Sequence, residues 1–398
     1  MQNSKRKIQQ IVAICIGHFM NDVFMNLLIP LSFMFKIKMG LTYAEQAMIG
    51  TVIISLGSFG QPIVGHAVDK KGKSGLLIVA ILWIGVFTSI TGYINHYYLL
   101  LFIAGLGALG SALYHPLGSA LVISLLGKTK GAGLSIFITV GSFAIGFAPF
   151  VAIPLVTKFG LKYLIVFVIP TVLTALIMYF FKVHQIKFGE KLEDDKNRTK
   201  VIDRSKIRWV SSLITVSVIR SLIFRSFLLA FGVQVLLIKG VEDIVAGIAV
   251  SLLMWTTSAG TFAGGYLSDK YGGKKIMTAS NVVVTSLLIL LIFTEGVPAL
   301  VVFTLIGFGA GLGNTPNITM AQEIIPRNTS LATGLVFGLG GGLGGVIMYF
   351  YGMIADSTSL ITAVTLLLIP VIAMDIIIFF NPIYEDGEIV NKLTVKSK

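Results

Sequence analysis

The sequence has 398 residues, of which 55% are hydrophobic and 12% charged, and its mean hydropathy is +0.89. This balance excludes a soluble globular protein of this length and is typical of a chain that crosses a membrane many times. The formal net charge of +13 does not predict a nucleic-acid partner, because most basic residues lie in short loops between apolar segments.

Apolar segments long enough to span a bilayer recur along the whole chain. They predict an all-α polytopic membrane protein with about twelve transmembrane helices in two pseudo-symmetric six-helix bundles. The expected spans are residues 8–35, 43–67, 75–94, 97–125, 131–157, 161–181, 209–238, 243–267, 276–294, 297–322, 331–353 and 359–381.

One charged stretch, residues 182–208, interrupts the apolar pattern. We interpret it as a cytoplasmic linker with a short surface helix at most. It divides the chain into an N-terminal bundle at 1–181 and a C-terminal bundle at 209–384, followed by a cytoplasmic tail at 385–398.

The basic residues predict the orientation in the membrane. Of the 31 lysines and arginines, 24 lie in the termini and in the loops on the same side as the termini. Because cytoplasmic loops are enriched in Lys and Arg, both termini should be cytoplasmic, in a bacterial plasma membrane. The single cysteine, Cys15, allows no intramolecular disulfide, and we expect no metal and no cofactor.

The first span carries three polar side chains at membrane depth. His18 and Asp22 are four residues apart and so share one helix face, with Asn21 beside them. A charge at the centre of a transmembrane helix costs about 2.5–3.5 kcal/mol and is retained for pairing or function. We predict that Asp22 carries a proton with the help of His18, and that Asn21 contacts substrate.

The second span holds Gln61, a predicted substrate contact, beside the hinge residue Pro62. It ends in a Gly-x-x-x-Asp-Lys-x-Gly motif that recurs 200 residues later, at the end of the eighth span. A single copy would indicate only a loop, but two copies in register predict a latch that opens during a conformational change. The predicted latch residues are Gly65, Asp69, Lys70, Gly72, Gly265, Asp269, Lys270 and Gly272.

The fourth span contains Tyr114 and His115 before a proline, and its repeat in the tenth span places Asn314 two residues before another proline. We predict that Tyr114, His115 and Asn314 line a cavity and contact substrate. The alternative for His115, a histidine that stabilises the proline kink, is equally supported by the sequence.

Arg220 and Arg225 lie within the seventh span, which corresponds to the first in the repeat. We predict that Arg220 faces Asp22 and binds an anionic substrate, the alternative being a permanent structural pair between the two side chains. At 100° per residue Arg225 is turned about 140° away from Arg220, and its role stays open. For Asp375, in the last span, a structural partner or a position at an inner interface is at least as well supported as a transport role, so we leave it out of the site.

The two repeated loops resemble the signature of the major facilitator superfamily. Within that family, the segments around His18, Gln61, His115, Arg220 and Asp356 resemble the fosmidomycin-resistance-type exporters. The resemblance implies proton-driven antiport of small, often anionic compounds or drugs out of a bacterial cell. In the fifth span Gly146 and Pro149 are separated by two residues, whereas the antiporter signature places Gly directly before Pro, so transport is better supported than export.

The sequence therefore predicts a monomeric, proton-coupled secondary transporter for a small molecule. The alternatives are an uptake symporter for an organic anion and an exporter of an endogenous metabolite such as a metal-chelating metallophore. A membrane enzyme is disfavoured because no catalytic constellation or appended domain is evident.

Overall fold

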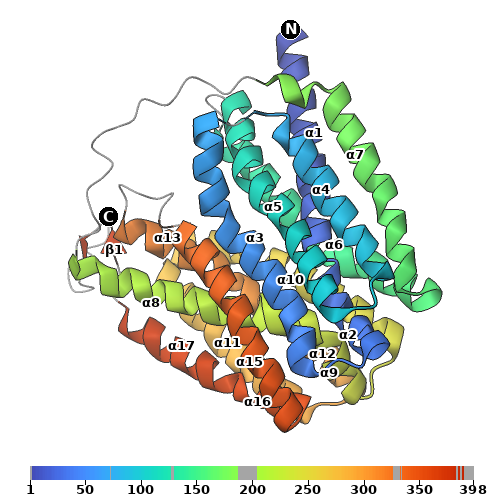
Figure 1. Ribbon diagram of the computed structural model, residues 1–398. Helices are drawn as coiled ribbons and strands as arrows, with labels where there is room; N and C mark the ends of the chain where they lie inside the picture. Colours follow the sequence, from blue (N-terminus) through green and yellow to red (C-terminus); the bar gives the residue numbers. More distant parts are fainter. Residues whose placement is uncertain are drawn as a thin grey trace.

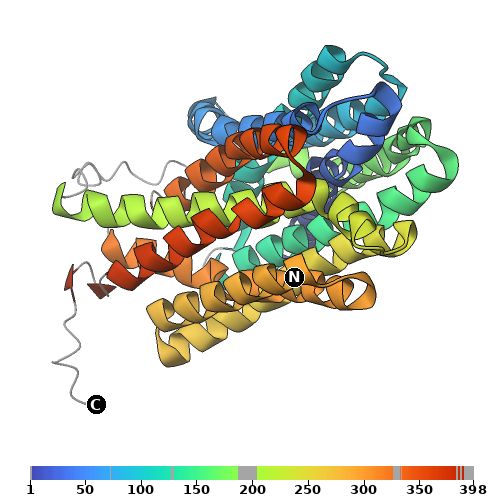
Figure 2. The same ribbon diagram turned by 90° about the horizontal axis from the view of Figure 1, so that it is seen from below.

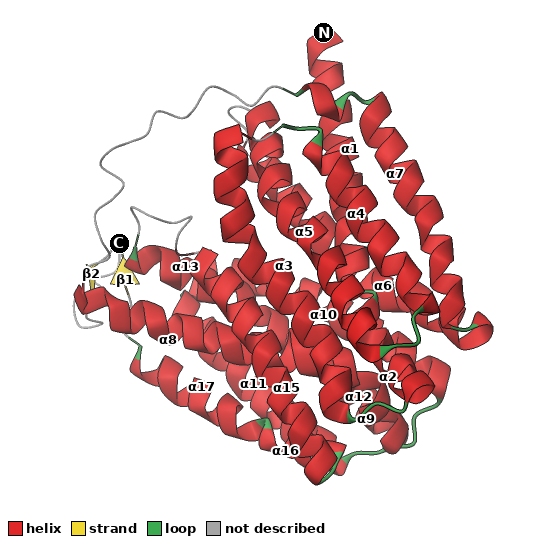
Figure 3. Cartoon of the chain, in the orientation of Figure 1, coloured by secondary structure: helices red, strands yellow, loops and turns green. Residues whose placement is uncertain are grey.

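The computed structural model describes residues 2–71, 73–126, 130–186, 204–325, 332, 334–381, 384–385 and 388–389. These residues fold almost entirely into helices, joined by short loops (Figure 3). The N-terminal half contains α1 (Gln2–Met25), α2 (Leu28–Met39), α3 (Tyr43–Lys71), α4 (Leu76–Ile90), η1 (Thr91–Tyr93), α5 (Tyr97–Leu126), α6 (Lys130–Phe159), η3 (Leu161–Phe167), α7 (Val168–Phe180) and η4 (Val183–Gln185).

The C-terminal half repeats this organisation. It contains α8 (Arg204–Arg220), η5 (Ser221–Phe227), α9 (Leu228–Ile238), α10 (Asp243–Tyr271), α11 (Gly273–Phe293), α12 (Gly296–Leu312), α13 (Asn314–Ile324), η7 (Leu335–Leu339), α15 (Gly340–Ser357), α16 (Leu360–Leu366) and α17 (Leu368–Phe380). The strands β1 (Tyr384–Glu385) and β2 (Glu388–Ile389) form a small antiparallel ladder.

The predicted all-α membrane architecture is confirmed. In the described part of the chain, ten helical stretches are long and apolar enough to cross a membrane. The helix α3 and the glycine-rich helix α15 complete six passes in each half. Several passes combine two helices, as where α1 and α2 meet at residues 26–27.

The duplication is visible in local structure as well as in the motif. Lys38 donates hydrogen bonds to the carbonyl oxygens of Gly92 and Ile94, and Lys239 donates to those of Ile292 and Thr294. In each half, an ammonium group after the first pass thus satisfies carbonyls at the end of the third pass. Gly40 and Gly240 follow these passes with φ angles of 67° and 78°, a left-handed conformation that favours glycine.

The two halves converge at the end where α2 and α9 lie and diverge toward the end that carries both termini (Figure 1). Seen from below, the helices of the C-terminal half, from yellow-green to red, lie side by side, with α8 beside α17 (Figure 2). Across the halves α3 packs against α15 and α6 against α10. The contacts between halves are therefore concentrated at the converging end, which we call the closed end.

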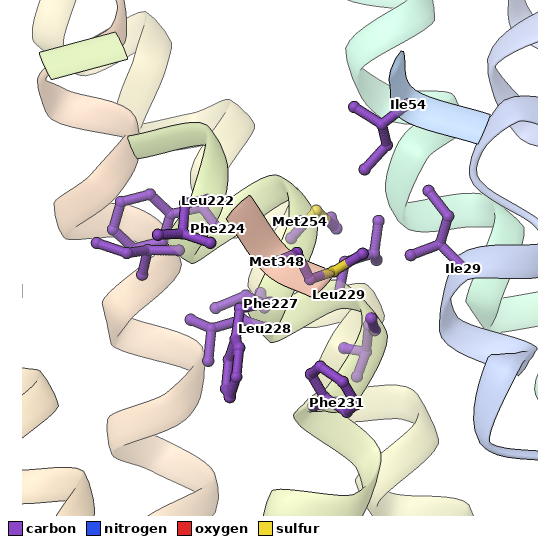
Figure 4. Close-up of a cluster of buried hydrophobic side chains, with 14 of the residues drawn as sticks. Ile29, Ile54, Leu222, Phe224, Phe227, Leu228, Leu229, Phe231, Met254 and Met348 are labelled. Carbon is purple, nitrogen blue, oxygen red and sulfur yellow. The ribbon is translucent and has the colours of Figure 1, made fainter. Parts of the chain in front are cut away.

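A buried apolar cluster fills the closed end (Figure 4). It joins α2 and α3 of one half to η5, α9, α10 and α15 of the other, through Ile29, Ile54, Leu222, Phe224, Phe227, Leu228, Leu229, Phe231, Met254 and Met348. Buried polar bonds cross it: Gln46 donates to the side chain of Gln234 at 2.7 Å, and Thr51 donates to the Gly345 carbonyl at 2.7 Å.

Asp356 makes a further contact between the halves at the closed end. One carboxylate oxygen accepts from the backbone N–H of Tyr43 at 2.6 Å and the other from that of Ala44 at 2.8 Å. These N–H groups belong to the first turn of α3, where no intrahelical acceptor exists. Asp356, in the last turn of α15, thus caps a helix of the opposite half.

Candidate functional site

A cluster of titratable side chains lies in the N-terminal half, where α1 passes α5. The Nε2 atom of His18 lies 3.2 Å from Nδ1 of His115 and 3.4 Å from Oδ2 of Asp22. The Nε2 atom of His115 lies 3.2 Å from Oδ1 of Asp22. His18 and Asp22 are buried and His115 is half-buried, so His115 is the member that reaches open space.

Neighbouring groups hold this His18–Asp22–His115 cluster in place. The amide of Asn21 donates to Oδ1 of Asp22 and to the hydroxyl of Ser111, both at 3.0 Å. The Nδ1 atom of His18 lies 2.8 Å from the carbonyl oxygen of Phe137 on α6, and the His18 ring stacks on the Phe137 ring at 3.8 Å. Three helices therefore fix the geometry of the cluster.

Gly141 on α6 allows this close packing. A methyl group at position 141 would collide with the carboxylate of Asp22 and the ring of His18. Since overpacking costs about 1–3 kcal/mol, we expect Gly141→Ala to lower the pH-gradient-driven transport that the sequence predicts about tenfold or more while every titratable group remains. Flux into reconstituted vesicles measures this.

The matched control for that substitution is Gly338→Ala, because a methyl group there has no neighbour within 4 Å among the described residues. Wild-type flux in both variants would contradict a role for the packing of this cluster. Thermal unfolding in detergent checks that both variants fold.

The cluster also has the composition of a metal site. Each of its three members offers one potential ligand atom, and these atoms all lie within 4.8 Å of one another. Within the described residues this is the only group of three such side chains that could hold a metal ion. Each member is, however, already engaged by another member or by Phe137 and Asn21. A bound proton satisfies these contacts without moving any atom.

Tyr114 does not line a cavity, contrary to the prediction. Its side chain is 0% exposed, and its hydroxyl donates to the carbonyl of Ile14 at 2.8 Å. Tyr114 is therefore a packing residue between α5 and α1, and only its neighbour His115 reaches the site. The helix α5 runs through Pro116 without interruption.

Arg220 is also placed differently from the prediction. Its guanidinium is buried and donates to the carbonyl of Ala310 and to the side chains of Ser280, Asn281 and Asn314, all in the C-terminal half. In the described part of the chain it forms no ion pair with Asp22. Arg220 therefore ties α8 to α11, α12 and α13 through both Nη groups, whereas its buried Nε has no hydrogen-bond partner among the described residues.

Asn314 belongs to the same network and is half-buried. Its amide oxygen accepts from Arg220 and its amide nitrogen donates to Thr261 at 3.0 Å. In the second repeat, Asn314, two residues before Pro316, therefore has a structural role. In the first repeat, His115, directly before Pro116, belongs to the titratable cluster.

Arg225, whose role the sequence left open, is exposed within the seventh pass. The segment η5 is a π-helix, and its wider turn changes the direction of side chains from that expected of an α-helix. Among the described residues Arg225 has no hydrogen bond or ion pair, but its charge interacts electrostatically with Asp22. Of the two arginines in this pass, Arg225 is the one whose charge interacts with that of Asp22.

The remaining predicted residues lie apart from this cluster. Gln61 is half-buried in α3. Asp269 and Lys270 are exposed, and Gly272 adopts a φ angle of 91° between α10 and α11. Gly265 packs near Thr315. Of the first copy, Gly72 lies outside the described residues, as do the side chains at Gly65, Asp69 and Lys70, so the latch stays a prediction.

Asp375 lies outside the cluster, as expected. Its carboxylate accepts from the hydroxyl of Thr285 at 3.0 Å, which links α17 to α11. Ser111 and Phe137 make contacts with the cluster that carry no signal in the sequence, because Phe137 accepts through its backbone carbonyl and Ser111 comes from another helix.

Comparisons with known proteins agree with this geometry. Residues 14–241 and 235–388 match the Major Facilitator Superfamily. The fosmidomycin resistance protein of Escherichia coli (strain K12) is 23% identical over 357 residues, which are 87% of this chain and 86% of that protein. An uncharacterized MFS-type transporter of Bacillus subtilis (strain 168), YfnC, is 26% identical over 92% of this chain and 90% of that protein.

Two solved structures share the fold. One is a bacterial homolog of the human lysosomal transporter Spinster, in an inward-facing and occupied conformation, with a TM-score of 0.75, 15% identity and coverage of 93% of this chain and 96% of that chain. The other is the nucleoside transporter NupG, with a TM-score of 0.76, 14% identity and coverage of 93% and 99%.

Proposed function

The chain belongs to the Major Facilitator Superfamily, and from that premise we propose that it is a monomeric, proton-coupled antiporter that exports small, anionic organic compounds or drugs by alternating access. It would act in a bacterial plasma membrane with both termini in the cytoplasm, so that its closed end faces outward. The fosmidomycin-resistance relative supports export, and the basic loops support the orientation.

The observation that carries this proposal is the His18–Asp22–His115 cluster. The carbonyl of Phe137 only accepts, so Nδ1 of His18 holds a hydrogen. A second hydrogen between Nε2 of His18 and Nδ1 of His115, and a third between Nε2 of His115 and Asp22, would complete the contacts of the cluster. This arrangement contains one proton more than two neutral imidazoles and an ionised carboxylate would carry.

Removal of that proton would leave lone pairs facing each other at 3.2 Å in a buried site. We therefore propose that the described conformation is the proton-loaded one, in which the cluster as a whole is electrically neutral. Loss of the proton gives Asp22 an unbalanced charge, which favours a different conformation of the two halves. Proton binding is coupled to alternating access in this way.

A specific observation favours a second candidate, an uptake symporter. The free cation Arg225 interacts electrostatically with Asp22. A proton on the cluster neutralises Asp22 and releases Arg225 for an anion, so that proton and anion bind together. Symport requires that the proton and the substrate bind to the same conformation, as they would here.

The experiment uses proteoliposomes with an imposed pH gradient and an internal pH-sensitive dye. Phosphonates, carboxylates and lipophilic cations are added in turn, and the dye reports proton movement driven by each compound. Collapse of the gradient by anions supports proton coupling and the anionic substrate class, and the direction of substrate movement separates antiport from symport. A response to none of the three classes would contradict the proposal.

A further inference from the structure

Arg225 occupies an unusual position for a cation. It lies near the middle of the pass that runs from Ile207 to Ile238, about 20 Å from the latter end. A charge at this depth is costly unless it faces water or a partner. Arg225 is exposed and, within the described residues, has no hydrogen-bond partner, so its guanidinium is accessible to a ligand.

The contrast with Arg220 assigns the two arginines different roles. Arg220 uses its donors on Ala310 and three side chains of its own half, and binding an anion there would break that network. The guanidinium of Arg225 keeps its donors available for the two oxygens of a carboxylate or phosphonate.

An apolar cavity of about 490 Å³ lies beside α1, within the range of small-molecule sites. It runs along α1 from Ile8 to Phe19 and is closed on the other side by Ile136 and Val140 of α6. Phe19 precedes Asp22 by three residues, which places the end of the cavity one helical turn from the cluster.

We propose that Arg225 binds the anionic group of an amphipathic substrate, and that the apolar body of this substrate occupies the cavity along α1. The inference rests on the proposed transport function and identifies the substrate class and the residue that selects it. Asp22 and the substrate compete for Arg225, so the proton on the cluster determines which of the two pairs with it.

Equilibrium binding to the purified protein in detergent tests the anion site. The probes are 4-phenylbutylphosphonate, which has both parts, and 4-phenylbutanol, which lacks the charge. Arg225→Gln should weaken phosphonate binding roughly tenfold to hundredfold and leave alcohol binding unchanged. Arg208→Gln, an exposed arginine at the start of the same pass, is the matched control and should bind both probes as the wild type does.

Equal losses for both probes, or no loss for the phosphonate, would overturn the assignment. The second variant, Val12→Trp, fills the cavity without removing a charge. It should weaken 4-phenylbutylphosphonate at least tenfold but leave methylphosphonate, which has no apolar body, unaffected. Unchanged affinity for the longer phosphonate would overturn the cavity assignment.

A third variant distinguishes failure of this inference from failure of the proposed function. Asp22→Asn removes the competing carboxylate, so it should bind 4-phenylbutylphosphonate at least as tightly as the wild type. Weaker binding would show that Asp22 does not compete for Arg225 and would overturn the inference. Proton-driven flux, measured separately in vesicles, tests the proposed function.

Discussion

Asp22→Asn is expected to abolish proton-driven net transport and to preserve substrate exchange. Asparagine has nearly the shape of aspartate, so its amide oxygen can still accept from Asn21, but without the carboxylate charge the cluster no longer holds the extra proton. Net flux under a pH gradient should fall to the leak rate of empty vesicles. Exchange of labelled for unlabelled substrate without a gradient needs no proton release and should continue.

Asp375→Asn is the matched control, since Asp375 is a second carboxylate within a span and lies outside the cluster. It should keep proton-driven flux. If Asp22→Asn transports against a gradient as the wild type does, the cluster is not the proton carrier. Loss of both exchange and net flux would indicate a structural role.

Asp356→Ala is expected to open the closed end. The substitution removes two charge-assisted hydrogen bonds to the first turn of α3, each with a net value of about 1.5–3 kcal/mol. Even one of them corresponds to about a tenfold change in the ratio of closed to open molecules. Spin labels at Ile37 and Ile238, two exposed positions after the first pass of each half, should show a longer mean distance in the variant.

The labelled proteins should carry Cys15→Ser so that only the introduced cysteines react. Asp243→Ala is the control, because Asp243 is an exposed carboxylate in the first turn of α10 near the same end and makes no contact between the halves within the described part of the chain. An unchanged distance distribution in Asp356→Ala would show that the cap does not hold the halves together.

The architecture was predictable from the sequence because it depends on the length and spacing of apolar segments. The same holds for His18 and Asp22, whose spacing of four places them on one helix face and whose atoms lie 3.4 Å apart. His115 comes from another helix, and only its polarity at membrane depth indicated a role. The sequence could not decide between its two interpretations.

The two arginines show where such reasoning fails. The angle of 140° between Arg220 and Arg225 assumes an α-helix throughout, whereas η5 is a π-helix. No residue type marks a π-helix in advance, and the direction of each side chain after it depends on packing. The prediction that Tyr114 lines a cavity fails for a related reason. The hydroxyl of a tyrosine at membrane depth can donate equally well to a backbone carbonyl or to a ligand.

The glycine-rich face of α15 affects how fast the two halves can move. Gly341 and Gly345 lie against Ser58, Ile54 and Ser55 of α3, and the serine and threonine hydroxyls of α3 bond to carbonyl oxygens of α15. Across a contact between a flat glycine surface and small side chains, few side chains interdigitate, so few must separate when the helices move. If the halves rock as proposed, we expect a low steric barrier along this seam and a turnover rate limited by the few polar bonds across it.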